Sequence, residues 1–149
     1  MREVRRSALI GQPPERMFAL INDIESYPQF LPWCTSAHVQ SRTDRELIAS
    51  VGVRRGPLNS QFTTRNELTA NRHIAMRLVS GPFKTLEGDW SFTPVDVPGQ
   101  PGCRVDLVLR FAFANRLAAM VFEPLFEETA ASLVDAFVAR ARALAADAH

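Results

Sequence analysis

Apolar and polar residues alternate along most of the middle of the chain, most clearly in residues 103–113. One face of that segment carries Cys103, Val105, Leu107, Leu109, Phe111 and Phe113. The charged residues Arg104, Asp106 and Arg110 fall on the opposite face. The same alternation recurs in residues 45–53, 58–68, 73–79 and 84–94. Strands with one apolar and one polar face are typical of an antiparallel sheet that covers a core on one side.

The N-terminal part of the chain predicts a strand followed by helical elements. Residues 3–10 favour a strand that leads to Gly11, and Pro13 and Pro14 suit the first turn of a helix. Met17, Phe18, Ile21 and Ile24 follow at helical spacing. The segment 27–34 contains two prolines and predicts a short helix or turn rather than a long one. Residues 97–102 predict a hairpin loop.

The last segment, about residues 115–146, has the spacing of one long amphipathic helix. Its apolar face comprises Phe126, Ala130, Leu133, Val134, Phe137, Ala141 and Leu144. Pro124 predicts that this helix begins or kinks there. The order is therefore a strand, one or two helices, a run of about six antiparallel strands and a long helix that covers the apolar face of the sheet.

Length and composition indicate one α+β domain over residues 1–149. The 17 basic and 16 acidic residues leave a net charge of +1, which favours no polyanionic partner such as DNA. Eight arginines, at positions 2, 5, 6, 54, 55, 65, 72 and 77, would form a basic surface if they gathered, but the balanced charge favours a dispersed arrangement. The N-terminus lacks a signal peptide, and no run approaches the ~18 apolar residues of a membrane span. We therefore expect a cytoplasmic protein whose membrane contact is at most peripheral.

Residues that carry chemistry are sparse. His38, His73 and His149 have no metal-ligand spacing, and no nucleophile motif occurs. Cys34 and Cys103 are far apart and predict free thiols. The sequence thus favours a binding protein without metal or cofactor. An enzyme would have to use the inward polar positions Ser60, Thr64 and Asn66, which are equally suited to hydrogen bonding within the sheet. Periodicity alone favours a filled core over a ligand cavity.

Two stretches of the sequence favour a ligand cavity instead of a filled core. Residues 27–34 (YPQFLPWC) and 81–94 (GPFKTLEGDWSFTP) resemble the signature stretches of the coenzyme Q-binding START-like family, which includes a bacterial branch of ribosome association toxins. Residues 62–66 and 111–113 also resemble family positions, and the similarity spans about residues 3–145. It implies a START-like helix-grip fold, in which a curved seven-stranded antiparallel sheet surrounds a long C-terminal helix. Pro124 departs from the family pattern and puts the straightness of that helix in question.

The resemblance also implies what the interior holds. We expect an apolar tunnel that accepts a polyprenyl quinone such as ubiquinone, or a similar lipid, near the inner membrane. The bacterial branch adds binding to the large ribosomal subunit and interference with subunit joining, and related cyclases keep an enzyme as an alternative. The residues expected at the cavity or its mouth are Tyr27, Phe30, Trp33, Phe62, Asn66, Phe83, Leu86, Trp90, Phe92, Leu109, Phe111, Phe113, Phe126 and Leu133.

Overall fold

Seven strands form a single antiparallel sheet in the computed structural model, which describes residues 1–147; His149 lies outside the described residues. The strand order is β1-β7-β6-β5-β4-β3-β2. The strands are β1 (Arg2–Ile10), β2 (Cys34–Arg42), β3 (Glu46–Arg55), β4 (Leu58–Thr69), β5 (His73–Ser80), β6 (Phe83–Val97) and β7 (Gln100–Phe113). The antiparallel sheet expected from the alternation is confirmed.

The alternation also assigned the two faces of the sheet correctly. In the β6–β7 pair, Leu86 lies opposite Phe111 and Trp90 lies opposite Leu107, and all four side chains are buried. The polar residues between them face outward, where Arg110 forms ion pairs with carboxylates on both neighbouring strands. Cross-strand neighbours on the apolar face thus build the floor of the core.

Two local features differ from the expectation. Strand β2 was not singled out by the pattern, because register shifts between Cys34 and Ser36 and between Val39 and Ser41 interrupt its alternation. The predicted loop over residues 97–102 is much shorter, since β6 runs to Val97 and β7 begins at Gln100. The turn between them places Gly99 at a φ of 84°, a left-handed conformation that glycine adopts without strain.

The N-terminal helical segment is divided into two pieces. Helix α1 (Pro14–Asn22) ends before Ile24, which lies instead in the 3-10 helix η1 (Ile24–Gln29). The apolar residues at helical spacing, from Met17 to Ile24, therefore continue past the end of α1 into η1. η1 contains Pro28 and confirms that the aromatic segment begins with a short helix.

The C-terminal helix is also divided, but not at the expected residue. Helix α2 (Arg116–Ala131) continues through Pro124, and Ser132 separates it from α3 (Leu133–Asp147). The hydroxyl of Ser132 donates to the Thr129 carbonyl at 2.7 Å, a side-chain bond that competes with the regular backbone pattern. Pro124 lies on the exposed face, where water can bond the carbonyl that loses its partner. The predicted kink is thus present eight residues later.

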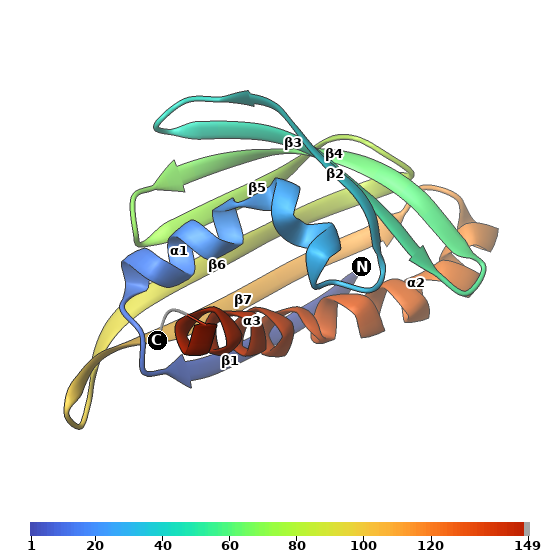
Figure 1. Ribbon diagram of the computed structural model, residues 1–149. Helices are drawn as coiled ribbons and strands as arrows, with labels where there is room; N and C mark the ends of the chain where they lie inside the picture. Colours follow the sequence, from blue (N-terminus) through green and yellow to red (C-terminus); the bar gives the residue numbers. More distant parts are fainter. Residues whose placement is uncertain (148–149) are drawn as a thin grey trace.

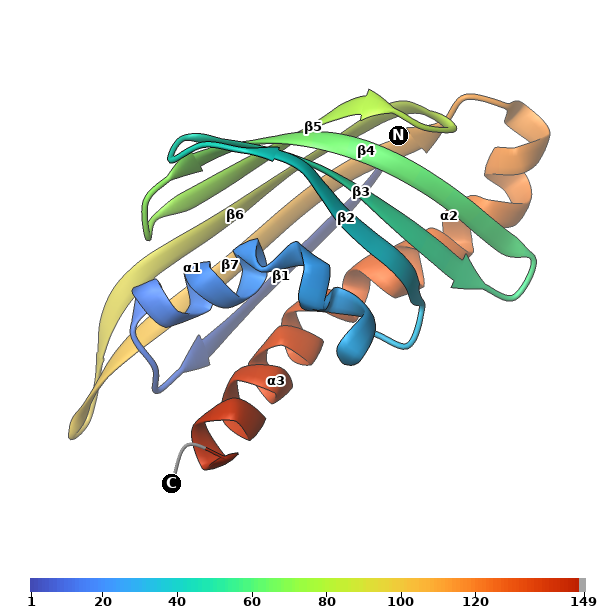
Figure 2. The ribbon, with the colours of Figure 1, turned by 45° about the horizontal axis from the view of Figure 1, so that its top comes forward.

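Figures 1 and 2 show the sheet curving over the α2–α3 helix, with α1 and η1 across the same concave side. Five of the seven apolar helix positions are buried, among them Phe126 and Phe137, and Leu133 is half-buried. Leu144 is 43 % exposed, so its assignment to the buried face was wrong. The arrangement is a helix-grip fold whose gripping helix is bent.

Candidate functional site

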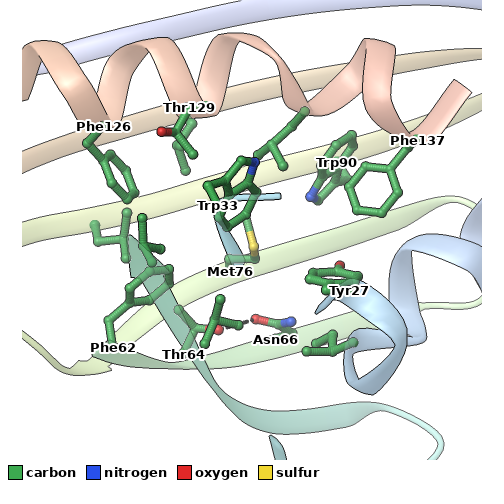
Figure 3. A pocket seen from close by; sticks show the side chains of 17 residues that line it. Tyr27, Trp33, Phe62, Thr64, Asn66, Met76, Trp90, Phe126, Thr129 and Phe137 are labelled. Carbon is green, nitrogen blue, oxygen red and sulfur yellow. Dashed lines mark hydrogen bonds between the residues drawn. The ribbon is translucent and has the colours of Figure 1, made fainter. Parts of the chain in front are cut away.

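A cavity lies between the concave face of the sheet and the α2–α3 helix (Figure 3). The space between its lining atoms, including the part open to solvent, is about 730 Å³, of which about 90 Å³ admits the centre of a water-sized sphere. The wall comprises Ile24, Tyr27, Trp33, Val51, Val53, Phe62, Thr64, Asn66, Met76, Leu86, Trp90, Leu109, Phe126, Thr129, Ala130, Leu133 and Phe137. Thirteen of these 17 side chains are aliphatic, aromatic or thioether groups without a hydroxyl or amide, so the wall is mainly apolar.

Each part of the bent helix contributes one phenylalanine around which aromatic rings gather. Phe126 of α2 contacts Phe83 and Phe111, with ring centroids 5.1 and 4.8 Å apart. Phe137 of α3 contacts Tyr27 and Trp90 at 5.3 and 5.5 Å. All these contacts are edge-to-face, the geometry that aromatic rings prefer. Both phenylalanines line the cavity, so rigid ring clusters support its wall from α2 and from α3.

Three hydroxyl groups in the wall donate to protein oxygen atoms. Thr64 Oγ1 donates to Asn66 Oδ1 at 3.0 Å, as the dashed line in Figure 3 shows. Thr129 Oγ1 donates to the Leu125 carbonyl at 3.0 Å, and the Tyr27 hydroxyl donates to the Ile21 carbonyl. These three hydroxyl groups therefore already donate their hydrogens to protein atoms rather than to the cavity.

Three N–H groups in the same wall have no protein acceptor within the described part of the chain. They are the NH2 group of the Asn66 side chain and the indole N–H groups of Trp33 and Trp90, none of which donates a hydrogen bond to another described residue. Asn66 is 4 % and Trp90 3 % exposed, so neither amide nor indole lies on the outer surface. None of the three nitrogens is among the fully buried side-chain atoms without a partner, which in the described residues are Gln12 Oε1 and Asn22 Oδ1, so they are accessible and can donate to water or to a ligand that accepts hydrogen bonds.

Tyr27 remains neutral at physiological pH. Burial raises the pKa of its hydroxyl well above the usual range, and the nearby Cys34 and Asp23 raise it further. The bond to the Ile21 carbonyl fixes the ring at the end of α1, where the ring also contacts Phe30. Tyr27 therefore serves the cavity as an apolar wall rather than as an acid or base.

Polar contacts join the helix to the opposite strands and η1. Arg55 at the end of β3 pairs with Glu128 of α2 at 3.0 Å. On α3, Arg140 donates to Gln29 at 3.1 Å and lies 5.1 Å above the Phe30 ring. Both contacts are exposed, so they hold the helix against β3 and η1 at the surface of the protein.

The structure brings nine of the fourteen expected site residues to the cavity wall: Tyr27, Trp33, Phe62, Asn66, Leu86, Trp90, Leu109, Phe126 and Leu133. The other five are not in the wall. Phe83, Phe111 and Phe113 pack around the Phe126 ring. Phe92 packs against Phe18, and Phe30 lies between Tyr27, Phe137 and Arg140.

Eight wall residues were absent from the expected set: Ile24, Val51, Val53, Thr64, Met76, Thr129, Ala130 and Phe137. The strand residues among them lie on faces that the alternation had already marked as inward. Thr129 follows Phe126 by three positions and so shares its helix face, which is the signal that could have identified it. A threonine in a helix attracts little notice, because its hydroxyl commonly bonds back to the preceding turn, as it does here.

Among residues 1–147, the groups that would suggest catalysis are not assembled at this cavity. His73 pairs with Asp89 at 2.9 Å on the outward face, and His38 lies near Glu25 on the surface. The cysteines are free and buried, and burial raises the pKa of both thiols. Within residues 1–147, no group of three or more His, Cys, Asp or Glu residues is placed to hold a metal ion. Thr64 and Asn66 are in the wall, whereas Ser60 is not.

The surface carries both signs of charge. Of the eight arginines considered above, Arg2, Arg5, Arg55, Arg65 and Arg77 form ion pairs with carboxylates. No described helix is long and apolar enough to cross a membrane. The aromatic residues of segment 27–34 are half-buried, and Leu117 and Met120 on α2 are the more exposed apolar side chains, at 74 and 72 %.

The chain is similar to curated proteins over nearly its whole length. It is 44% identical over 142 residues to the ribosome association toxin RatA of Escherichia coli strain K12, which covers 95% of this chain and 88% of that protein. It is 26% identical over 140 residues to the mitochondrial coenzyme Q-binding protein COQ10 of Drosophila melanogaster, covering 92% of this chain and 57% of that protein.

Solved structures share the fold. A START superfamily protein from Mycobacterium smegmatis superimposes with a TM-score of 0.78 at 20% identity, covering 95% of this chain and 98% of that one. The Zhui aromatase/cyclase from Streptomyces sp. R1128 gives a TM-score of 0.82 at 16% identity, covering 95% and 93%. The family described as polyketide cyclase/dehydrase and lipid transport matches residues 10–138. The chain therefore belongs to this family, and it has the START-like helix-grip fold.

Proposed function

We propose that this protein binds an apolar small molecule in the cavity, and that the ligand is a polyprenyl quinone such as ubiquinone or a similar lipid. The single observation that carries the proposal is the composition of the wall: aromatic and aliphatic side chains surround a few N–H donors that have no protein acceptor. A quinone matches both parts, because its isoprenoid tail is apolar and its carbonyl oxygens accept hydrogen bonds.

The energetics favour affinity without strict selection of tail length. Burying one methylene group contributes about 0.8 kcal/mol, so a fully buried isoprene unit contributes about 4 kcal/mol at most. The cavity volume open to a water-sized sphere is about 90 Å³, below the roughly 300–1,000 Å³ of small-molecule pockets, so a ligand of quinone size requires wall side chains to move. Because the apolar contribution is non-directional, tails of different length bind, and the polar groups select the head.

The proposal is tested by what the protein carries. Protein purified from its native cell is extracted with solvent and analysed by mass spectrometry, and the delipidated protein is titrated with decylubiquinone by calorimetry. We expect a co-purified quinone or lipid and binding at micromolar concentration. Absence of both would contradict the proposal.

A pair of neighbouring strand residues supplies a matched control. Leu109 lines the cavity, whereas Val108 precedes it on the outward face of β7. Leu109→Trp fills the cavity and is expected to abolish binding, while Val108→Trp leaves affinity unchanged. Thermal unfolding separates lost binding from overpacking, which costs about 1–3 kcal/mol of stability.

We further propose that the bound molecule is carried and not converted, in the cytoplasm or at the surface of the inner membrane. The support is the distribution of titratable groups: the described histidines face outward, and the Thr64 and Asn66 side chains bond each other. The cyclase alternative predicts turnover. Incubation of the protein with decylubiquinone or an aromatic polyketide, followed by chromatography, should return the compound unchanged. A product whose formation is lost in Asn66→Leu would favour the enzyme.

A second candidate function is binding to the large ribosomal subunit, with interference in subunit joining. Its support is the 44% identity, over 95% of the chain, to a protein named ribosome association toxin. Sedimentation with purified large subunits in a sucrose gradient at physiological salt tests it. Arg54 and Arg55 are the basic pair at the end of β3, and neutralising both should reduce binding if this surface is used. Arg65→Ala, on the outward face of β4, is the control. Absence from the subunit peak would leave ligand binding alone.

A further inference from the structure

The Asn66 amide is held in one orientation inside the cavity. Asn66 lies on β4 between Leu47 of β3 and Met76 of β5, and its side chain is 4 % exposed. Its oxygen accepts from Thr64 Oγ1 at 3.0 Å. The amide nitrogen lies at the far side from Thr64, as Figure 3 shows. Both N–H groups of the amide are therefore directed away from Thr64.

The strongest side-chain acceptor in the wall already accepts one hydrogen bond from the protein. The described part of the wall contains no carboxylate, and the Asn66 oxygen accepts from Thr64. The remaining side-chain acceptors are the hydroxyl oxygens of Thr64, Thr129 and Tyr27, which have committed their hydrogens to protein oxygen atoms. Against these stand the N–H groups of Asn66, Trp33 and Trp90. The wall thus presents N–H groups that make no hydrogen bond to a described residue, whereas each of its side-chain oxygens already takes part in one.

We propose that the cavity distinguishes the oxidation state of its ligand, binding an acceptor-only carbonyl head group, such as that of an oxidised quinone, in preference to the corresponding quinol. This inference rests on the proposed quinone-binding function. Asn66 is its specificity-determining residue, because its nitrogen donates to a ligand carbonyl while its oxygen accepts from Thr64.

The preference follows from the extra hydrogen of the reduced form. A quinone carbonyl accepts from Asn66 and brings no hydrogen of its own. A quinol hydroxyl also accepts, but its hydrogen must find an acceptor in the cavity or be buried without one. The hydroxyl oxygens of the wall accept less strongly than an amide carbonyl would. We therefore expect a preference of about tenfold in Kd, within the reach of one unmade hydrogen bond.

Calorimetric titration of the delipidated protein with decylubiquinone and with decylubiquinol, under anaerobic conditions, measures this preference directly. The two compounds share one tail, so the apolar contribution cancels in the comparison. A Kd about tenfold lower for the quinone supports the inference. Equal affinity, or tighter binding of the quinol, overturns it and leaves the proposed function standing. Binding of neither compound overturns the proposed function as well.

Variants assign the preference to Asn66. Asn66→Leu removes the donor and should bring the two Kd values together, mainly by weakening the quinone. The matched control Glu67→Leu changes the neighbouring exposed residue of β4, outside the wall, and should retain the tenfold ratio. Because Asn66→Leu leaves the Thr64 hydroxyl without its acceptor, the double variant Thr64→Val/Asn66→Leu replaces both partners by apolar groups and preserves the fold. A ratio that persists in the double variant overturns the assignment.

Discussion

Filling the cavity from the helix side provides a sharp test of whether an unfilled space exists. Ala130 is 1 % exposed, belongs to the cavity wall and lies on α2 one position after Thr129. Ala130→Leu adds three carbon atoms that can extend only into that space. Leucine and alanine have similar helix propensities, so the change acts through packing. In a filled core the same substitution would overpack and destabilise.

The magnitude follows from the size of the void. Cavities cost about 24 cal/mol per Å³, so the 90 Å³ open to a water-sized sphere corresponds to about 2 kcal/mol. Ala130→Leu recovers part of that and is expected to raise the free energy of unfolding by about 1–2 kcal/mol. For a chain of this length, Tm should rise by roughly 2–8 °C.

Differential scanning calorimetry measures the change in Tm, and titration with decylubiquinone measures binding, which should be abolished. Ala139→Leu is the matched control, because Ala139 is an exposed residue of α3 and the same atoms are added outside the core. It should leave both quantities nearly unchanged. A fall in Tm for Ala130→Leu, with ligand binding retained, would refute the cavity as the binding site.

Three further outcomes are expected. Gly88→Ala should weaken ligand binding by displacing the two wall side chains that its Cβ would approach, Met76 at 2.6 Å and Leu109 at 2.9 Å, and its Kd can be measured beside that of the wild type. Burial raises the pKa of Cys103 from 9.0 to about 11. The unfolded chain therefore loses the thiol proton at a lower pH than the folded protein does, and the free energy of unfolding should fall as pH rises from about 9 to 11. Urea titrations across that range should show a smaller fall for Cys103→Ala. Arg55→Ala, which removes an exposed ion pair to α2, should change the free energy of unfolding by less than about 1 kcal/mol, and a larger change would show that this contact holds the helix in place.

Much of the fold was predictable because an antiparallel strand exposes its period directly. All six alternating apolar residues from Cys103 to Phe113 are buried, as their spacing indicates. Strand β2 escaped prediction because its two register shifts each move the following side chains to the other face. The bend of the C-terminal helix was predicted at Pro124 and occurs at Ser132, where a hydroxyl-to-carbonyl bond ends the regular turn. The cost of a proline depends on solvent access to the freed carbonyl, and sequence spacing does not report that access.

The cavity was harder to predict than the face that contains it. Leu109, Phe111 and Phe113 share the inward face of β7, yet Leu109 alone of the three lies in the wall. The Phe126 ring covers the two phenylalanines, with centroid distances of 4.8 and 6.2 Å. Periodicity identifies which side chains face inward, but where the helix stops filling the space depends on ring contacts between distant segments.

The cavity also bears on how the protein responds to pressure. Unfolding eliminates internal voids, so each void makes the volume change of unfolding more negative. A space of 90 Å³ per molecule corresponds to about 50 mL/mol at most, comparable to the whole volume change of many small proteins. A molecule bound among Trp90, Leu109 and Phe126 would remove much of this contribution to the volume change of unfolding. The ligand-free protein should thus unfold at lower hydrostatic pressure than the occupied one, so the midpoint pressure measures how completely the interior is filled.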